Sequence, residues 1–460
     1  MADPRRWSPA WLYNVSGLAS LQATGRDAWL IILSRTARMF AFGAISLTMA
    51  LFFAELGFSD FRIGLFMSLT LLGDVALGVV VTLMADGLGR RRVILAGGLL
   101  MALSGLVFAV FESFWVLLPA AVVGVVSAGG SDFGPFRAIE ESMLSHITVP
   151  DTRAHVLSWY VTCSSLGSAA GTEIAGRFLE ELRKREGWDM LRVYHAGFLV
   201  YVVMGGLNMV FALLLSKKCE IARRVEDESL DEAGQRLLGD ADADADAGPE
   251  PAVEVSEPSS SRKSRFSRIS APTRSVMYRL WFLLIIDSLA DGMVSKTLTT
   301  YYLDRKFSVS KSQLGDIMST ALILATVSTV FAGPLAHYIG LLNTMVFTHL
   351  PSSAAVLLFP FPRSLWVTVG LLFVRWGLNN MDQAPRSAFI AAIVKDEERT
   401  AVMGITSALR TLAMTLGPSF TGGLAQGGRF WVAFVMGGSL RIVYDLGLWA
   451  MFVNVRLSGQ

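Results

Sequence analysis

The chain has little cysteine, and the motifs of common enzyme sites are missing. Its 460 residues include two cysteines, Cys163 and Cys219, and five histidines. Two cysteines on separate segments make neither a disulfide framework nor a metal site. The sequence also lacks His-Glu-x-x-His, Gly-x-Ser-x-Gly and a P-loop, which argues against a metalloprotease, a serine hydrolase and an ATP-driven pump. We therefore expect no enzymatic activity, no cofactor and no bound metal.

Charge is also scarce. Charged residues make up 17% of the chain, hydrophobic residues make up 53%, and the mean hydropathy is +0.49. A soluble chain of this length needs a more polar surface than this composition provides. We therefore expect a bilayer as the solvent and membrane lipid as a partner, and we expect no nucleic-acid partner.

Apolar segments long enough to cross a bilayer recur along the chain. A spanning helix needs roughly 20 predominantly apolar residues. The sequence predicts an all-α membrane protein with twelve transmembrane helices, six on each side of one long polar stretch. The expected spans are 29–53, 61–84, 92–110, 114–136, 154–178, 194–215, 279–302, 313–334, 342–361, 364–387, 400–423 and 431–454.

The two sets of six helices are related by an internal repeat. When the chain is shifted by about 250 residues, Asp132 and Pro135 meet Asp382 and Pro385. Other anchors lie at nearly the same shift, pairing Ile63-Gly64 with Leu314-Gly315 and Ala85-Asp86-Gly87 with Ala336-His337-Tyr338. In membranes, a duplicated helical unit belongs mostly to transporters.

These patterns divide the chain into five parts. We expect a cytoplasmic N-terminal segment (1–28), a six-helix bundle (29–216), a flexible cytoplasmic linker (217–278), a second six-helix bundle (279–454) and a cytoplasmic tail (455–460). The linker prediction rests on an acidic run followed by a Ser-Arg-rich run with almost no apolar periodicity.

Basic residues in the short loops predict the orientation. They fall mainly on the side of the linker, which the positive-inside rule places in the cytoplasm together with both termini. These residues are Arg90, Arg91, Arg92, Arg153, Lys217, Lys218, Lys395 and Arg399. The plasma membrane is the default location for such a chain, with an organelle membrane as the alternative, and one monomer can form a complete pathway.

The loop after residue 84 resembles a family signature. Asp86, Gly89, Arg90 and Arg91 match the motif between helices 2 and 3 of the major facilitator superfamily, while Thr82 replaces its first glycine. The resemblance implies the fold of that superfamily and a cytoplasmic latch that holds the two halves together when the cavity faces outward. The alternative is that the arginines only set the topology.

The resemblance also implies that helices 1, 4, 7 and 10 line a central cavity, and each of these predicted helices carries charge. An ionisable residue inside a bilayer is costly unless it faces a cavity or a partner. The predicted cavity and substrate residues are Arg35, Arg38, Arg137, Lys296, Arg375 and Asn379, and the predicted proton-coupling residues are Asp132, Asp287 and Asp291. For each of them a structural ion pair is the competing interpretation. Asp74, Arg410 and Arg441 fall on helices expected outside the cavity, where structural pairing is favoured.

The predicted function is secondary active transport of a small solute by alternating access. The aspartates on helix 7 motivate proton coupling, and the cavity arginines motivate an anionic or zwitterionic substrate. The alternative is a transporter-derived membrane sensor that signals through the linker. Deletion of residues 222–270 separates the two, because a carrier should still move solute whereas a sensor should lose its output.

Overall fold

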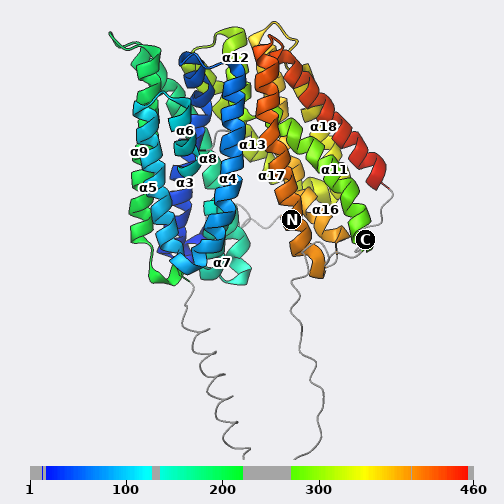
Figure 1. The fold of residues 1–460 in the computed structure, drawn as a ribbon. Coiled ribbons are helices and arrows are strands. Elements are labelled where there is room, and N and C mark those ends of the chain that lie inside the picture. Colours follow the sequence, from blue (N-terminus) through cyan, green and yellow to red (C-terminus); the bar gives the residue numbers. More distant parts are fainter. Residues whose placement is uncertain (1–12, 14–16, 127–134, 221–270, 395, 454–460) are drawn as a thin grey trace, which may run out of the picture.

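The computed structural model describes residue 13 and residues 17–126, 135–220, 271–394 and 396–453, and all regular structure in these ranges is helical (Figure 1). Seven of the described helices are long and apolar enough to cross a membrane. The prediction of an all-α, multi-pass membrane protein is thus confirmed. A helical segment occupies each of the twelve predicted spans, and the count of twelve crossings stays a prediction.

The first bundle is drawn in blue to green in Figure 1. Its helices are α2 (Leu18–Thr24), α3 (Arg26–Glu55), α4 (Asp60–Leu88), α5 (Arg90–Val110), α6 (Phe114–Val123), α7 (Pro135–Ile147), α8 (Pro150–Arg183), α9 (Met190–Leu214) and the short η2 (Lys217–Cys219). Local signals fix several ends. Asp189 caps α9 by accepting a hydrogen bond from the Arg192 backbone N–H at 2.9 Å, and Pro150 opens α8, where a missing N–H costs nothing.

The second bundle is drawn in light green to red. Its helices are α11 (Ala271–Met293), α12 (Lys296–Phe307), α13 (Lys311–Ile339), α14 (Leu341–Leu358), α15 (Leu365–Asn379), η4 (Asn380–Asp382), α16 (Gln383–Ile393), α17 (Asp396–Gln426) and α18 (Phe430–Phe452). Since α11 starts at Ala271 and η2 follows α9, both ends of the predicted linker carry helix.

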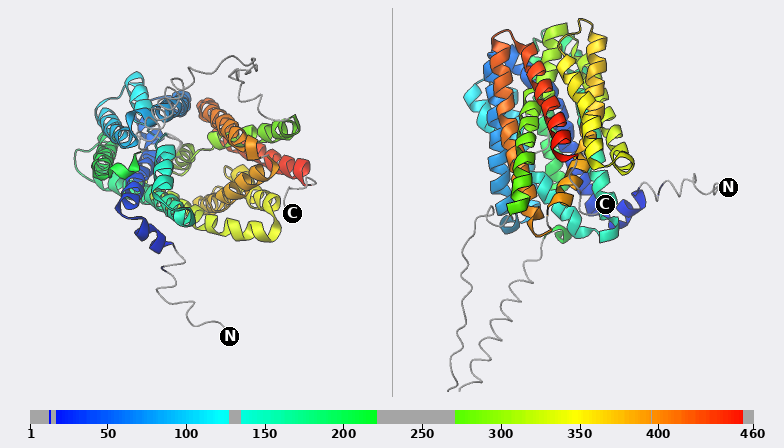
Figure 2. Two further views of the ribbon diagram at one scale, coloured as in Figure 1. Left: turned by 90° about the horizontal axis from the view of Figure 1, so that it is seen from below. Right: turned by 90° about the vertical axis from the view of Figure 1, so that its right-hand side faces the viewer.

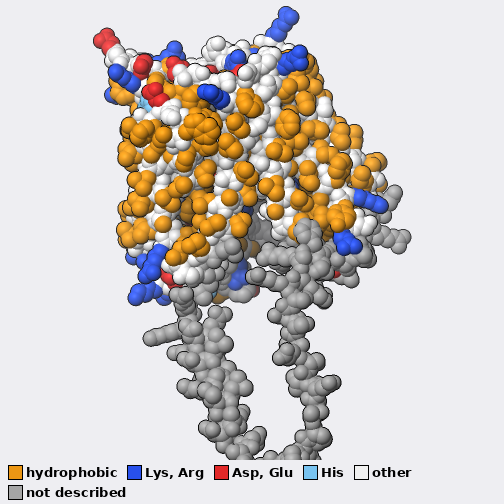
Figure 3. All heavy atoms as spheres, viewed as in Figure 1, with side chains coloured by type: hydrophobic (Ala, Val, Ile, Leu, Met, Phe, Trp, Pro, Cys, Tyr) orange, Lys and Arg blue, Asp and Glu red, His pale blue; other side chains and the backbone are white. Residues whose placement is uncertain are grey.

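Apolar side chains cover the flanks of both bundles. Figure 3 shows them as a broad band, with charged side chains gathered above and below it. Large members of this surface are well exposed, among them Trp115 (75%), Val330 (72%) and Trp366 (67%). A surface of this kind is stable against lipid tails and unfavourable in water.

The two bundles meet along two equivalent helix pairs, α4 with α17 and α8 with α13. Glycine permits the close approach in both. A Cβ built on Gly64 would lie 2.2 Å from the Pro418 carbonyl oxygen, and one on Gly315 would lie 3.1 Å from the Thr172 carbonyl oxygen. Gly64 and Gly315 are also partners in the sequence repeat. The duplicated unit therefore places equivalent glycines at equivalent contacts between the halves.

Three of the predicted spans are interrupted. Span 114–136 contains α6 and the start of α7, span 279–302 contains α11 and α12, and span 364–387 contains α15, η4 and part of α16. Interrupted helices expose backbone groups where they line a cavity or contact other parts of the protein.

The end of the molecule at which α9 finishes and α11 begins is called the linker end here. The start of α3 lies at the same end, because the Ser216 backbone N–H donates to Asp27 Oδ1 at 3.0 Å. The view from below in Figure 2 looks onto this end, with one bundle on each side.

Candidate functional site

A cavity of about 560 Å³ lies between the two bundles. Most of its wall comes from the second half, and the lining includes Leu71, Arg137, Ser165, Asp291, Ser295, Lys296, Arg375, Trp376, Asn379, Arg386, Met403 and Arg410. Five of these residues are basic and one is acidic. In Figure 3 the surface is hollowed between the halves toward the linker end. The wall of the cavity is therefore cationic.

Two of the cavity cations are buried and bonded only to neutral groups. Lys296 is 4% exposed and its Nζ donates to Thr172 Oγ1 at 3.0 Å. Arg375 is 6% exposed, with Nη1 donating to Thr299 Oγ1 at 3.0 Å and Nη2 donating to the Val294 carbonyl oxygen. Among the described residues, neither cation has a carboxylate oxygen within 4.0 Å. Both charges thus lack a counter-ion from the described ranges of the chain.

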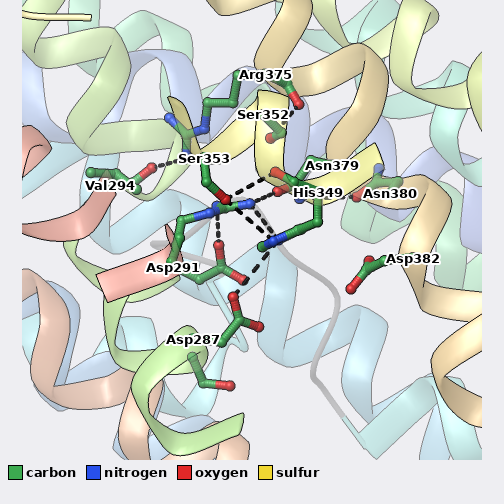
Figure 4. A network of polar contacts seen from close by, with 12 residues as sticks. Asp287, Asp291, Val294, His349, Ser352, Ser353, Arg375, Asn379, Asn380 and Asp382 are labelled. Carbon is green, nitrogen blue, oxygen red and sulfur yellow. Dashed lines mark hydrogen bonds and ion pairs between the residues drawn. The ribbon is translucent and has the colours of Figure 1, made fainter. Parts of the chain in front are cut away.

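Arg375 lies at the break between α11 and α12. The carbonyl of Val294 has no partner in a continuing helix, and it accepts hydrogen bonds from Arg375 and from Thr299 Oγ1, the latter at 3.1 Å. In Figure 4 the Arg375 guanidinium points toward Val294. Arg375 therefore stabilises the break, because its guanidinium donates the hydrogen bond that the Val294 carbonyl would receive from a backbone N–H in a continuous helix.

A second group of charges lies deeper in the C-terminal half (Figure 4). Arg441 is fully buried and donates from Nη1 to Asp291 Oδ1 at 2.6 Å, from Nη2 to His349 Nε2 at 2.7 Å, and also to Asn379. His349 Nδ1 lies 2.7 Å from Asp445 Oδ1. Asp291 and Asn379 line the cavity, so Arg441 connects the cavity wall to the buried histidine.

Asp287 is the most enclosed carboxylate of this group. Its residue is 0% exposed, and neither oxygen has a hydrogen-bond partner among the described residues. Three basic groups stand just beyond hydrogen-bond distance: His349 Nε2 and Arg386 Nη1 at 3.7 Å, and Arg410 Nη2 at 3.9 Å. Arg386 is paired with Asp382 one turn before it. We name the eight residues Asp287, Asp291, His349, Asp382, Arg386, Arg410, Arg441 and Asp445 the C-half charge cluster.

The structure places Arg137, Lys296, Arg375, Asn379 and Asp291 on the cavity wall. Arg137 is half exposed and pairs with Glu141 at 2.7 Å. Asp287 lies behind the wall in the C-half charge cluster. The structure brings most of the candidates from the second half into one region.

Arg35 and Arg38 do not belong to the lining of this cavity in the part of the chain that the structure describes, in contrast to the expectation. Arg38 Nη2 pairs with Glu140 Oε2 at 2.6 Å, and Arg35 Nη1 donates to the Tyr160 hydroxyl at 2.6 Å. Both are directed into the packing of α3 against α7 and α8, because acceptors are available there. Arg410, expected outside the cavity, lies on its wall instead.

Of the remaining candidates, Gly89, Arg90 and Arg91 lie near the linker end. Asp132 lies outside the described residues, and so does the side chain of Asp86, although its backbone belongs to α4. Gly89 has φ of +92°, which favours glycine, and a Cβ there would lie 2.8 Å from Glu220 Oε2. Arg90 is buried and Arg91 Nη2 lies 3.5 Å from the Leu213 carbonyl oxygen. The latch across the halves stays a prediction.

His349, Arg386 and Asp445 were missed by the sequence reasoning. A signal was available, because all three are ionisable residues inside predicted spans (342–361, 364–387 and 431–454). His349 and Asp445 are partners that lie 96 residues apart in the sequence, whereas Arg386 pairs with Asp382 one turn before it.

At the end opposite the linker the two halves are held together by polar contacts. Asp60 of α4 accepts hydrogen bonds from Tyr301 at 2.7 Å and from Arg305 at 2.5 Å. Glu173 accepts from Ser319 at 2.7 Å, and Glu180 accepts from the Lys311 backbone N–H at 3.0 Å. The halves are therefore closed at this end, while the cavity extends toward the linker end.

Comparison with known proteins places this arrangement among transporters. A family model described as Major Facilitator Superfamily matches residues 31–267 and 280–459. The chain is 31% identical over 438 residues to a protein of Saccharomyces cerevisiae described as uncharacterized membrane protein YJR124C, covering 94% of this chain and 96% of that one.

Solved structures share the fold at low sequence identity. The nucleoside transporter NupG superposes with a TM-score of 0.67 at 14% identity, covering 93% of this chain and 99% of that one. A bacterial homologue of the human lysosomal transporter Spinster, solved in an inward-facing and occupied conformation, gives a TM-score of 0.67 at 15% identity, covering 94% and 98%.

Proposed function

The chain belongs to the major facilitator superfamily, and from this premise we propose that it is a secondary transporter whose solute is a small anion or a zwitterion with an anionic group. The cavity between the halves is the site of binding. Transport follows from alternating access, in which the halves separate at one end as they close at the other.

The observation that carries this proposal is the pair of cavity cations for which the described residues supply no counter-ion. Burial of a charge is unfavourable unless the charge gains a partner. Lys296 and Arg375 are both more than nine-tenths buried and bond only to hydroxyl and carbonyl oxygens. An anionic solute supplies the missing opposite charge, whereas a cationic solute would add to the repulsion.

Unused hydrogen-bond donors surround the same position. Ser295 Oγ and Trp376 Nε1 line the cavity, are buried and have no hydrogen-bond partner in the described part of the chain. A carboxylate, phosphate or sulfate group can accept hydrogen bonds from several donors at once. Asp291 lies on the same wall with its side chain 30% exposed, which suits the cationic end of a zwitterion.

Lys296 also connects binding to the motion of the halves. It belongs to α12 in the second half, while Thr172 belongs to α8 in the first. A bound anion competes with Thr172 for the ammonium group. Solute binding therefore competes with the Lys296–Thr172 hydrogen bond, which joins the two halves beside the cavity.

Proton coupling is the second part of the proposal. Asp287 and Asp291 lie among guanidinium groups, and a carboxylate in such surroundings can exchange a proton when its partners move. If a protein with both residues changed to asparagine remained fully proton-driven, this part would be refuted.

The first test is the thermal stability of the purified full-length protein against organic anions, phosphate, sulfate, cations and neutral solutes at about pH 5.5 and 7.5. A ligand present at about 100 times its Kd raises the unfolding free energy by about 2.7 kcal/mol. We expect only ligands that carry an anionic group to stabilise the protein. Stabilisation by cations or neutral solutes alone would contradict the proposal.

The variants Lys296→Gln and Arg375→Gln locate the binding. Each removes one charge from the wall, and we expect each to weaken the effective anion at least about tenfold, which corresponds to about 1.4 kcal/mol. Lys184→Gln is the matched control, because Lys184 is exposed and pairs with Glu181 at 3.2 Å away from the cavity. Equal affinity in all three variants would place the site elsewhere.

A further inference from the structure

His349 is a buried histidine behind the cavity wall. It is 2% exposed and belongs to α14. Nδ1 lies 2.7 Å from Asp445 Oδ1 and 3.3 Å from Ser353 Oγ, while Nε2 lies 2.7 Å from Arg441 Nη2 and 3.7 Å from Asp287 Oδ1. Both ring nitrogens are therefore at hydrogen-bond distance from a charged group of α18.

The partners determine where the ring carries its proton. A guanidinium has only donors, so the bond from Arg441 Nη2 requires that Nε2 be an acceptor without a hydrogen. The proton of the neutral ring then sits on Nδ1 and is donated to Asp445. Ser353 Oγ donates to the second Asp445 oxygen at 2.7 Å, which leaves the carboxylate in the acceptor role.

The charges around the ring leave room for one more proton. The C-half charge cluster contains four carboxylates, Asp287, Asp291, Asp382 and Asp445, and three guanidiniums, Arg386, Arg410 and Arg441. With a neutral imidazole these carboxylates exceed these three guanidiniums by one. Arg375 on the cavity wall interacts with Asp291 and Arg441 and offsets this excess until a bound anion takes up its charge, and a second proton on His349 then restores the balance.

We propose that His349 takes up the coupled proton together with Asp287, and that proton binding at Nε2 exchanges its partner from Arg441 to Asp287. The proposal rests on the proposed transport function and adds a residue to it. Once Nε2 gains a hydrogen, it faces the N–H of Arg441, and two donors cannot share that contact. Asp287 Oδ1 is 3.7 Å away and accepts no hydrogen bond from any described residue, so it accepts the new N–H after a small ring movement.

Arg441 transmits the exchange to the cavity. Besides His349 it contacts Asp291 and Asn379, which both line the cavity. After His349 releases the guanidinium, Arg441 keeps its contacts with Asp291 and Asn379. The proton added to His349 makes this part of the cavity wall more positive. An anion consequently binds more tightly when His349 is protonated, which is the direction needed to carry a proton and an anion together.

The pH response depends on every charged or titratable group around the ring. Within the described part of the chain these are Arg441, Tyr444 and Asp445 of α18 and Asp287 of α11. Arg386 of α16 and Arg410 of α17 stand beyond Asp287, and Asp291 of α11 and Arg375 of α15 stand beyond Arg441. The Tyr444 ring meets the imidazole edge-on with centroids 5.6 Å apart.

The test is nitrogen NMR of the full-length protein labelled in its five histidines, in lipid nanodiscs. Loss of a signal in His349→Asn or His349→Gln assigns the ring. We expect a neutral ring with hydrogen on Nδ1 at about pH 7.5 that becomes doubly protonated as the pH falls toward about 5. A hydrogen on Nε2 at the higher pH, or a ring that stays neutral throughout, overturns the proposal.

Sulfate serves as the functional probe, because its charge is constant across this range. We expect its stabilising affinity to rise as the pH falls, by up to about tenfold per pH unit, the limit for one coupled proton. The rise should vanish in His349→Asn and persist in His195→Gln, a control in α9 whose ring contacts the Phe108 carbonyl oxygen at 2.8 Å. A rise that persists in His349→Asn also overturns the proposal. If sulfate does not bind, the anion proposal fails for this probe, while the NMR result still decides the role of His349.

Discussion

The two halves of the molecule treat their buried charges differently. In the first half, Arg38 and Tyr160 both donate to Glu140 Oε2, at 2.6 and 2.8 Å, and Arg35 donates to Tyr160. These contacts join α3, α7 and α8 within one bundle. In the second half, the C-half charge cluster connects α11, α14, η4, α16, α17 and α18 and reaches the cavity through Asp291, Arg386 and Arg410. Related helical units have thus placed charge in a packing role in one half and beside the cavity in the other.

A buried ion pair by itself therefore does not indicate that its residues bind solute or carry protons. A pair between close-packed helices mainly satisfies two groups that would otherwise be costly to bury. A cluster in which one group has alternative partners can change its pairing. We therefore expect replacement of a buried pair by apolar residues to preserve anion-dependent stabilisation in the first half and to abolish it in the second.

The largest effect is expected for Arg441→Leu. It leaves Asp291 without its guanidinium and removes a donor from His349, and loss of one partner of a buried pair costs about 3–5 kcal/mol. We expect little folded protein by size-exclusion chromatography. The double variant Arg441→Leu with Asp291→Leu should regain part of the stability but not anion-dependent stabilisation. A single variant as stable as the native protein would contradict the role of Arg441.

The Arg38–Glu140 pair should behave differently. Arg38→Met alone leaves the fully buried Glu140 without its ion-pair partner and should also cost about 3–5 kcal/mol. Adding Glu140→Leu replaces the pair by apolar packing and should restore most of the thermal stability together with anion-dependent stabilisation. If the double variant is stable but no longer stabilised by anions, the pair belongs to the solute pathway and the contrast between the halves is lost.

A smaller effect is expected at the interface between the halves. Gly64→Ala places a Cβ against the Pro418 carbonyl oxygen at the closed end, and overpacking of this kind costs about 1–3 kcal/mol. We expect the halves to separate there and the cavity to close at the linker end. A cysteine at Met403, on the cavity wall, should then react more slowly with a maleimide when Cys163 and Cys219 are replaced by serine.

Gly78→Ala is the matched control for this experiment. Gly78 belongs to the same helix, α4, and a Cβ there would meet no atom within 4 Å. Its labelling rate should equal that of the parent. Equal rates in Gly64→Ala and Gly78→Ala would show that the glycine contact does not control opening.

The smallest effect concerns the linker end of the first half. Cys219 is 0% exposed, and burial, together with the nearby Asp27 carboxylate, raises the pKa of its thiol to about 12. Because the raised pKa keeps the group as a thiol below that pH, alkylation in a Cys163→Ser protein should be slow at about pH 8 and accelerate in denaturant. Rapid alkylation of the native protein at that pH would show that this end opens readily.

Much of the fold could be predicted from the sequence, because apolar length and repetition are local properties. The expected span 29–53 corresponds to α3, Arg26–Glu55, and the expected span 431–454 corresponds to α18, Phe430–Phe452. The break at Val294 was not anticipated. Its carbonyl is satisfied by Arg375, 81 residues away, and no local pattern reports such a donor.

The candidate site was predicted in part for the same reason. Lys296 and Arg375 stood out because charge inside an apolar span is rare. Arg35 and Arg38 met the same criterion and yet pack into the first half, because their acceptors on α7 and α8 could not be located from sequence. Whether such a residue faces a cavity or a neighbouring helix depends on the rotation of its helix within the bundle.

The sequence by itself determined that this chain lies in a membrane, that its unit of helices is duplicated and that it carries charge within those helices. These properties follow from composition and spacing, which need no knowledge of distant contacts. Which charges pair and which line the cavity became clear from the three-dimensional structure alone. The free energy of a buried charge depends on the groups within a few ångströms of it, and in this fold those groups come from helices far apart in the sequence.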